Sequence, residues 1–452
     1  MKPSDTGEEG PHEMKLSTDR ILTTHVGSLP RPPELLTLLE ARETGREFDQ
    51  PAFETRLATS VHEIVAKQVA AGIDSVCDGE LGKISYTAYI RHRFSGIGSF
   101  RGDDNDKPPQ TAAHRDLLDH PDYMQRLNET RRISWFSREA VPCCTGPVTY
   151  SDPRPLETDL KNLAAACAAA KPVEAFMNAA SPGVLTKFVP DRYYQDEDAY
   201  VEALANALKV EYEEIVKAGF ILQIDAPDRG SARHNQYQHL TDDEFLRIAE
   251  RNIAAVNHAT ANIPPEMMRM HLCWGNYEGP HTHDIPLAKT FDTCMRARPA
   301  GLSFEAANPR HAHEWEDLRS KKIPDDKILI PGVIDSTTNF VEHPRLIAQR
   351  ICHYADIVGR ERVIAGADCG FATFAFVNNA VAPSVVWVKL SALAEGARVA
   401  SARLGLTTQL SLASARLWAR RCSARQRGAS CRPAGGEMQR KSCFLAPKAM
   451  AA

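Results

Sequence analysis

Four residues of this chain have the types and the surroundings of metal ligands: His271, Cys273, Glu305 and Cys369. Each lies at the end of a short apolar run that is typical of a β-strand, in MRMHLCWGN, GLSFEAAN and VIAGADCGF. His271 and Cys273 are two residues apart, so on a strand both side chains point to the same face. An imidazole, a carboxylate and two thiolates form a ligand set that tetrahedral zinc accepts. The chain lacks the close CxxC pairs of structural zinc fingers, so we predict a zinc ion that takes part in chemistry.

This ligand set favours one class of reaction. Two thiolates and a carboxylate offset the charge of the metal, which makes the ion a weak Lewis acid for activating water. The same ion is well suited to holding a further thiol as its thiolate, because coordination removes the thiol proton. A thiolate held in this way still attacks electrophilic carbon, so the sequence predicts alkyl transfer to sulfur. Hydrolysis ranks lower, because zinc sites that activate water are usually rich in histidine.

The elements that must position these residues alternate along the chain. Short strand-like runs such as GFILQIDAPD and KILIPGVID are each followed by a segment with helical character. We predict helices over residues 53–71, 156–170, 196–218, 242–261, 286–298, 311–321, 343–358 and 384–404. Strands that alternate with helices indicate a parallel sheet built from βαβ crossovers. With VPCCTGPVTY set aside as an extra hairpin, eight strand–helix units remain, which is the number in a closed (β/α)8 TIM barrel.

A barrel of this kind places its active site at the C-terminal ends of its strands. In chain order the polar residues at seven of the eight expected strand ends are His25, Ser28, Asp78, Glu80, Asp225, His271, Cys273, Glu305, Asp335 and Cys369. The candidate ligands therefore fall where the fold would put a site. This agreement between residue type and position supports both the predicted fold and the predicted site.

Composition limits the class of protein. The content of 43% hydrophobic and 25% charged residues is that of a soluble globular chain, and no run approaches the roughly 20 apolar residues of a membrane span. The N-terminus lacks the basic and apolar regions of a signal peptide, and the scattered cysteines suit reduced thiols, so we expect a cytoplasmic protein. From Arg403 onward ten Lys or Arg residues face one acidic residue, so this segment carries +9, and the rest must carry −13 to give the total of −4. An acidic body argues against nucleic acid as the main partner.

We predict three parts in the chain. Residues 1–18 are expected to be a disordered leader, and residues 19–404 to form the catalytic barrel. Within the barrel, the loop-rich segment Lys83–Arg138 is expected to run over its top as an excursion. Residues 405–452 have no sustained periodicity and are rich in Arg, Ser and Ala, so we expect a basic, disordered tail. The sequence also allows a homo-oligomer.

The motifs as a set resemble the C-terminal catalytic barrel of the cobalamin-independent methionine synthase family and its short relatives. The resemblance is carried by THVGSLPRP, CDGELGK, LQIDAPD, MRMHLCWGN, SFEAAN, PGVID and GADCGF, in order from about Arg20 to Leu404. It implies zinc bound by the four residues named first, and homocysteine as the thiol that accepts a methyl group from a methyltetrahydrofolate-type donor. It also implies that Ser28, Glu80 and Asp225 hold the amino-acid end of homocysteine. Carboxylates suit an ammonium group and a hydroxyl suits a carboxylate.

The chain departs from the pattern of this family at one position that concerns proton transfer. The family has a histidine two residues after the aspartate of PGVID, here Asp335, and this chain has Thr337 instead. We therefore assign catalytic roles to Asp335 and His343. The alternatives are a water as the proton source, or an electrophile that needs different protonation.

Two other functions stay open at this stage. The family's short relatives include epoxyalkane:coenzyme M transferases, which add a thiol to an epoxide. Their substrate carries a sulfonate, for which Arg31 or Lys83 would be the cationic partner. A non-catalytic barrel that binds zinc or a thiol is the alternative from another class.

Other eye-catching residues have simpler interpretations. His281 and His283 form an HxH pair in a Gly/Pro/Asp-rich loop and are predicted to face solvent. His311 is predicted to lie at the start of a helix, near its N-cap or facing water. Cys143 and Cys144 are adjacent on a strand, point to opposite faces, and are predicted to be buried as small apolar residues.

Overall fold

The computed structural model describes residues 13–100, 115–130, 141–377 and 379–406 of the chain. An eight-stranded parallel sheet is its central feature, with the strand order β1-β10-β9-β8-β7-β6-β5-β2. The strands are β1 Leu22–Thr23, β2 Ser75–Val76, β5 Glu174–Ala180, β6 Ile221–Asp225, β7 Met268–Leu272, β8 Gly301–Phe304, β9 Ile328–Ile334 and β10 Ile364–Ala367. The two end strands are joined by hydrogen bonds from Asp74 N to Thr23 O (3.1 Å) and from Thr24 Oγ1 to Ser75 O (3.1 Å). The sheet is thus nearly closed, and the predicted (β/α)8 barrel is confirmed.

A second, two-stranded antiparallel sheet consists of β3 Phe94–Phe100 and β4 Val141–Tyr150. β4 is the VPCCTGPVTY segment that the sequence sets apart from the barrel. Cys143 and Cys144 are both buried, as predicted.

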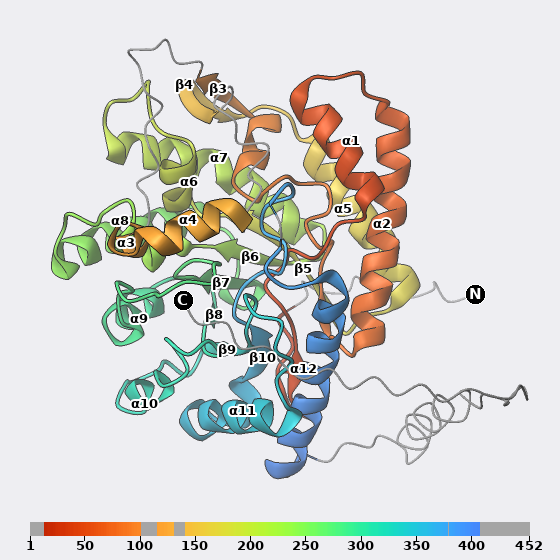
Figure 1. Cartoon of the computed structure of the whole chain (residues 1–452), viewed down its shortest axis with the longest axis vertical. Coiled ribbons are helices and arrows are strands. Elements are labelled where there is room, and N and C mark those ends of the chain that lie inside the picture. Colours follow the sequence, from red (N-terminus) through yellow and green to blue (C-terminus); the bar gives the residue numbers. More distant parts are fainter. Residues whose placement is uncertain (1–12, 101–114, 131–140, 378, 407–452) are drawn as a thin grey trace, which may run out of the picture. The chain divides into compact units, whose positions relative to one another are not determined.

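Helices follow the barrel strands and lie around them (Figure 1). They are α1 Pro33–Thr44, α2 Gln50–Ala71, α5 Arg154–Ala170, α6 Pro182–Phe188, α7 Glu197–Lys217, α8 Asp242–Ala259, α9 Leu287–Met295, α10 Trp315–Leu318, α11 Pro344–Val358 and α12 Pro383–Arg403. The excursion after β2 adds the 3-10 helix η1 Ala88–His92 and the helices α3 Arg115–Asp119 and α4 Pro121–Thr130. Local signals set several helix ends. Asp196 caps α7, and Thr241 forms a capping box with Glu244 at the start of α8.

One helix is shorter than predicted. The pattern over residues 311–321 predicts a helix of about three turns, whereas α10 has four residues. The amides of Glu314 and Glu316 bond to carbonyls three residues back, those of His311 and His313, so this stretch is wound as tight turns. The side chains of His311 and Glu314 in this stretch are buried and hydrogen-bonded to each other.

Apolar side chains fill the barrel and the layer between strands and helices. At one end of the barrel Met14 joins a buried cluster that includes Leu22, Phe176 and Ile330. Residues 13–18 therefore differ from the predicted disordered leader, because Met14 fills space beside Gly301 and Ser17 Oγ donates to Val363 O (2.6 Å). The predicted tail lies outside the described residues, apart from its first two positions. None of the described helices combines the length and the apolar character that crossing a membrane would require.

Candidate metal and substrate site

Three of the four predicted ligands form one buried cluster. His271 is near the end of β7, Cys273 follows that strand, and Cys369 lies two residues beyond β10. Candidate ligand atoms of the three side chains all lie within 4.8 Å of one another, and the two sulfurs are 3.6 Å apart. The Nδ1 atom of His271 lies 3.2 Å from Ser303 Oγ, whereas its Nε2 atom is buried without a hydrogen-bond partner. A zinc ion would satisfy this nitrogen and both sulfurs, so the donor set fits the metal.

The electrostatics of the cluster also suit a cation. The hydrogen bond to Cys369, together with burial, raises the pKa of the Cys273 thiol well above its usual range. Burial and the nearby Arg269 lower the pKa of His271 to about 3, so its imidazole is neutral. A neutral imidazole is the form that ligates metal, and a bound cation would favour the thiolates. Burial thus favours the uncharged forms of Cys273 and His271 when no cation is bound.

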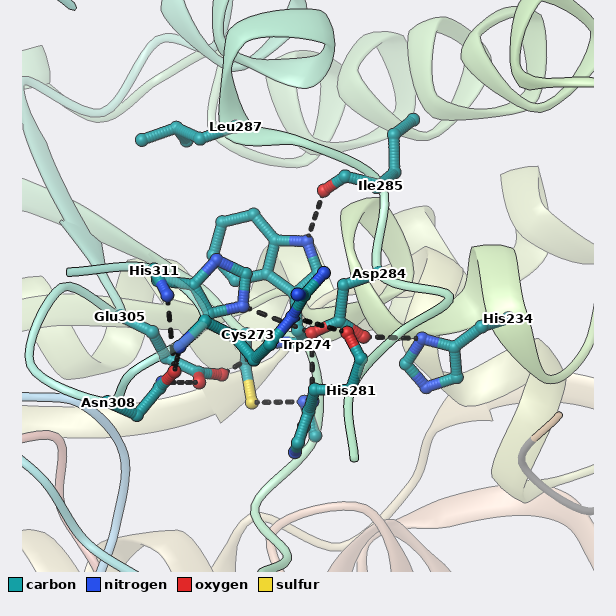
Figure 2. A network of polar contacts seen from close by, with 12 residues as sticks. His234, Cys273, Trp274, His281, Asp284, Ile285, Leu287, Glu305, Asn308 and His311 are labelled. Atoms are coloured by element: carbon teal, nitrogen blue, oxygen red, sulfur yellow. Dashed lines mark hydrogen bonds and ion pairs between the residues drawn. The ribbon is translucent and has the colours of Figure 1, made fainter. Parts of the chain in front are cut away.

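Glu305, the fourth predicted ligand, is buried beside this cluster without belonging to the compact group of three. Its carboxylate accepts hydrogen bonds from Trp274 N (2.8 Å) and from Asn308 Nδ2 (2.8 Å). Burial and the neighbouring Cys273 raise its pKa well above the usual range. Figure 2 shows Glu305 next to Cys273, held between these two donors.

A buried histidine–carboxylate network surrounds Trp274, the residue after Cys273 (Figure 2). Asp284 accepts hydrogen bonds from His281 (2.8 Å) and His311 (3.1 Å), and its other oxygen lies 2.9 Å from His234 Nδ1. The ring of His311 stacks on Trp274, with 4.2 Å between the ring centres. The prediction that His281 faces solvent is therefore wrong, because the fold turns the loop inward and buries the carboxylate with its three partners. His283 is only partly exposed and pairs with Asp119 of α3.

A cavity of about 290 Å³ opens onto the metal cluster. It brings the three predicted substrate residues, Ser28, Glu80 and Asp225, together with the three clustered ligands. Asp225 ends β6, and Glu80 lies in the loop after β2 with a φ of 55°, a left-handed conformation that costs energy outside glycine. The oxygen Oε2 of Glu80 is buried without a partner.

Burial raises the proton affinity of both carboxyl groups. Burial and the nearby Asp225 raise the pKa of Glu80 to about 8. Burial raises the pKa of Asp225 to about 6, against hydrogen bonds from Asn178 Nδ2 (3.0 Å) and Gln223 Nε2 (2.8 Å). A buried pair of carboxyl groups in a cavity is a suitable acceptor for an ammonium group.

Several predicted residues do not line the cavity. His343 is exposed and accepts a hydrogen bond from Arg345 N (3.1 Å) as the N-cap of α11. Asp335 is half-buried, accepts from the amides of Thr337 and Thr338, and lies 3.6 Å from the Lys389 ammonium. The structure therefore places the two predicted catalytic residues in a turn and a helix cap.

The two cations predicted for a sulfonate are occupied elsewhere. Arg31 donates to the backbone carbonyls of Ala372, Glu80 and Lys83 at 2.7–2.9 Å. Lys83 lies near Asn178 O (3.4 Å) and Met177 Sδ (3.7 Å). The cation that does line the cavity is Lys187 of α6, which the sequence analysis did not single out. No motif marks it, because its position follows from how α6 packs.

Comparison with known proteins agrees with the motifs. No model of a protein family matches the chain. Methionine synthase from Thermococcus kodakarensis is 25% identical over 359 residues, which are 77% of this chain and 86% of that protein. Methionine synthase from Saccharolobus solfataricus is 23% identical over 384 residues, 83% of this chain and 94% of that protein. These sequence likenesses confirm the resemblance to cobalamin-independent methionine synthases.

Two solved structures share the fold. A B12-independent methionine synthase from a Shewanella species, in complex with selenomethionine, has a TM-score of 0.62 and 20% identity, with 86% of this chain and all of that chain covered. A putative vitamin-B12-independent methionine synthase from Listeria monocytogenes has a TM-score of 0.56 and 18% identity, with 86% and 98% covered.

Proposed function

We propose that this chain, which resembles the cobalamin-independent methionine synthases, is a zinc-dependent S-methyltransferase that methylates homocysteine. The observation that carries the proposal is the His271–Cys273–Cys369 cluster, which lines the same cavity as Glu80 and Asp225. Zinc bound there would convert the thiol of a substrate into its nucleophilic thiolate. The names and the coverage of the sequence relatives support a methyl group as the group transferred.

The residues of the chain would supply binding and orientation. Glu80 and Asp225 would accept the ammonium group of homocysteine, and the Ser28 hydroxyl would donate to its carboxylate. His271, Cys273 and Cys369 would hold the metal, with Glu305 next to Cys273 as the fourth ligand. Anchoring the amino-acid end in this way directs the sulfur towards the metal cluster, and orientation of this kind removes much of the entropic barrier to reaction.

In the reaction, a carbon–sulfur bond forms as the bond between the methyl group and its donor breaks. We infer a methyltetrahydrofolate-type donor, in which the methyl group leaves a nitrogen atom. Asp335 and His343 have no place in this step, because neither lines the cavity. Addition of a sulfonated thiol to an epoxide is less well supported, because Arg31 and Lys83 already donate to the backbone.

The test measures methionine by mass spectrometry after zinc-loaded protein is mixed with homocysteine and 5-methyltetrahydrofolate. Cys273→Ser should lose both zinc and product, whereas Cys294→Ser, which changes a buried cysteine of α9, should keep both. Coenzyme M is offered as the competing thiol, with an epoxide as the electrophile. A preference for coenzyme M would contradict the proposal. Stoichiometric zinc without alkylation of any thiol would favour a binding protein instead.

A further inference from the structure

Lys187 reaches the cavity from a helix that is firmly held. Ser181 caps α6 by accepting from Val184 N and donates to Asp228 Oδ1 (2.6 Å). Gly183 lies so close to Asp228 and Asn252 that an added Cβ would come within 2.4 Å of both side chains. α6 therefore begins in tight contact with the polypeptide after β6, and Lys187, near its end, has a defined direction into the cavity.

The ammonium of Lys187 has no acceptor in the described part of the chain. It lies 5.1 Å from the centre of the Phe188 ring. It is also the one lysine or arginine among the described residues that line the cavity. Lys187 is half-buried, and a cation that lines a substrate cavity without a protein acceptor points to a partner that arrives with the substrate.

Lys187 lines the same cavity as His271, Cys273 and Cys369. Burial lowers its pKa to about 8, and the opposing influence comes from Cys273. Asp225 raises the pKa of Glu80, and neither of these two carboxyl groups contributes to the pKa of Lys187.

Other polar groups near α6 are already accounted for. Asp228 is bonded to Ser181 and Asn252, and the pKa of Tyr86 is raised well above its usual range by burial, so its hydroxyl stays neutral. The ammonium thus shares one cavity with the metal cluster, where sulfur and the departing group would meet.

We propose that Lys187 is a catalytic residue that protonates the atom from which the alkyl group departs. This inference rests on the proposed function and adds to it the proton source that Thr337, Asp335 and His343 do not supply. For an amine donor, the bonds, electrons and protons of this step are all accounted for. The nitrogen–methyl bond breaks, its electron pair stays on nitrogen, and that pair takes a proton from Lys187 Nζ, while the thiol proton has already been released. Solvent then reprotonates the lysine amine. An ammonium whose pKa lies near the operating pH is well matched to this task.

The test compares two methyl donors that differ in their need for a proton. With 5-methyltetrahydrofolate the leaving nitrogen must be protonated, whereas methyl iodide releases iodide, which needs no proton. Lys187→Met should lower the rate with the folate relative to the rate with methyl iodide by about 10²- to 10⁴-fold, the usual contribution of a general acid. Lys161→Met removes an exposed lysine of α5 and should leave the ratio unchanged. The wild-type rate with the folate should fall above about pH 8, and that with methyl iodide should not.

Two further measurements separate a proton donor from a fixed positive charge. Lys187→Arg keeps the charge but holds its proton too tightly to give it up, so it should not restore the folate rate. In zinc-loaded protein, acetylation of Lys187 followed by mass spectrometry should rise with a midpoint near pH 8. Restoration by arginine, or an unchanged ratio in Lys187→Met, would overturn the inference. If neither donor methylates homocysteine in the wild-type protein, the proposed function fails instead.

Discussion

His311 offers the sharpest test of the electrostatics around the metal cluster. Burial alone would lower the pKa of this histidine, but hydrogen bonds to Asp284 and Glu314 outweigh burial and raise the pKa to about 10. The residue therefore carries a buried positive charge at neutral pH, balanced by two carboxylates. Replacing it with glutamine removes the charge and keeps a polar side chain of moderate size.

The size of the effect follows from the two pKa values. The unfolded chain has a histidine pKa near 6.5, and the folded value is about 10. Because the folded pKa is the higher one, the stabilisation is fully present below pH 6.5 and is lost as the pH rises from there to 10. A difference of this size corresponds to a stabilisation on the order of 5 kcal/mol.

The assay is urea denaturation of the wild-type chain and of His311→Gln at intervals from pH 6 to pH 10. Other groups titrate in this range, so the quantity to follow is the difference between the two proteins. The unfolding free energy of the variant should be lower by several kcal/mol at pH 6 and should approach that of the wild type towards pH 10. His239→Gln, which changes an exposed histidine, should show a small difference at every pH. A difference between wild type and His311→Gln that stays constant over the range would refute a charged His311.

Three other substitutions test separate parts of the site and its support. Cys369→Ser should abolish stoichiometric zinc in the purified protein, and metal analysis that finds zinc retained would remove Cys369 from the ligand set. Gly370→Ala puts a Cβ within 2.0 Å of Ser28 Oγ, so Ser28 must move. The KM for homocysteine should then rise several-fold while zinc content is kept, and an unchanged KM would show that Ser28 does not hold the substrate. Arg93→Met leaves the buried Glu211 without its paired guanidinium. This should cost about 3–5 kcal/mol in urea denaturation, and a loss under 1 kcal/mol would contradict it.

Much of the barrel could be predicted because its strands and helices are encoded locally. Strand-like runs such as GLSF and ILIPGVI are short, apolar and followed by polar residues, and each became a buried parallel strand. Since parallel strands end at the same side of a barrel, residues distant in sequence meet there. That rule placed His271, Cys273 and Cys369 together, although Cys369 lies 96 residues after Cys273.

Residues whose roles arise from packing between loops could not be predicted in this way. The HxH of His281 and His283 looks the same in a solvent-facing loop as in a loop that folds inward. The loop folds inward because of Asp284, whose carboxylate is buried by contacts from three separate segments of the chain. The position of Lys187 also follows from packing, because the tight contact of Gly183 with Asp228 and Asn252 fixes the helix that carries it.

His343 shows how local sequence can argue against a role. It is predicted as a proton source because Thr337 replaces the histidine of the family, but it comes just before Pro344, at the start of α11. A residue in extended conformation directly before a helix that begins with proline is a natural N-cap, and its side chain bonds to the backbone of that helix. Local chemistry of this kind could have excluded His343 from the sequence alone.

The pKa values of Glu80 and Asp225 link substrate charge to the proposed chemistry. With a pKa of about 8 for Glu80 and about 6 for Asp225, the pair carries close to one negative charge at neutral pH when no ligand is bound. An ammonium group between them would favour the second carboxylate and release a proton. A thiol without an amine cannot obtain this gain, because burial continues to favour the protonated acid. Under the proposed function, the two carboxyl groups therefore select amino-acid thiols over simple ones, independently of the metal that would hold the sulfur.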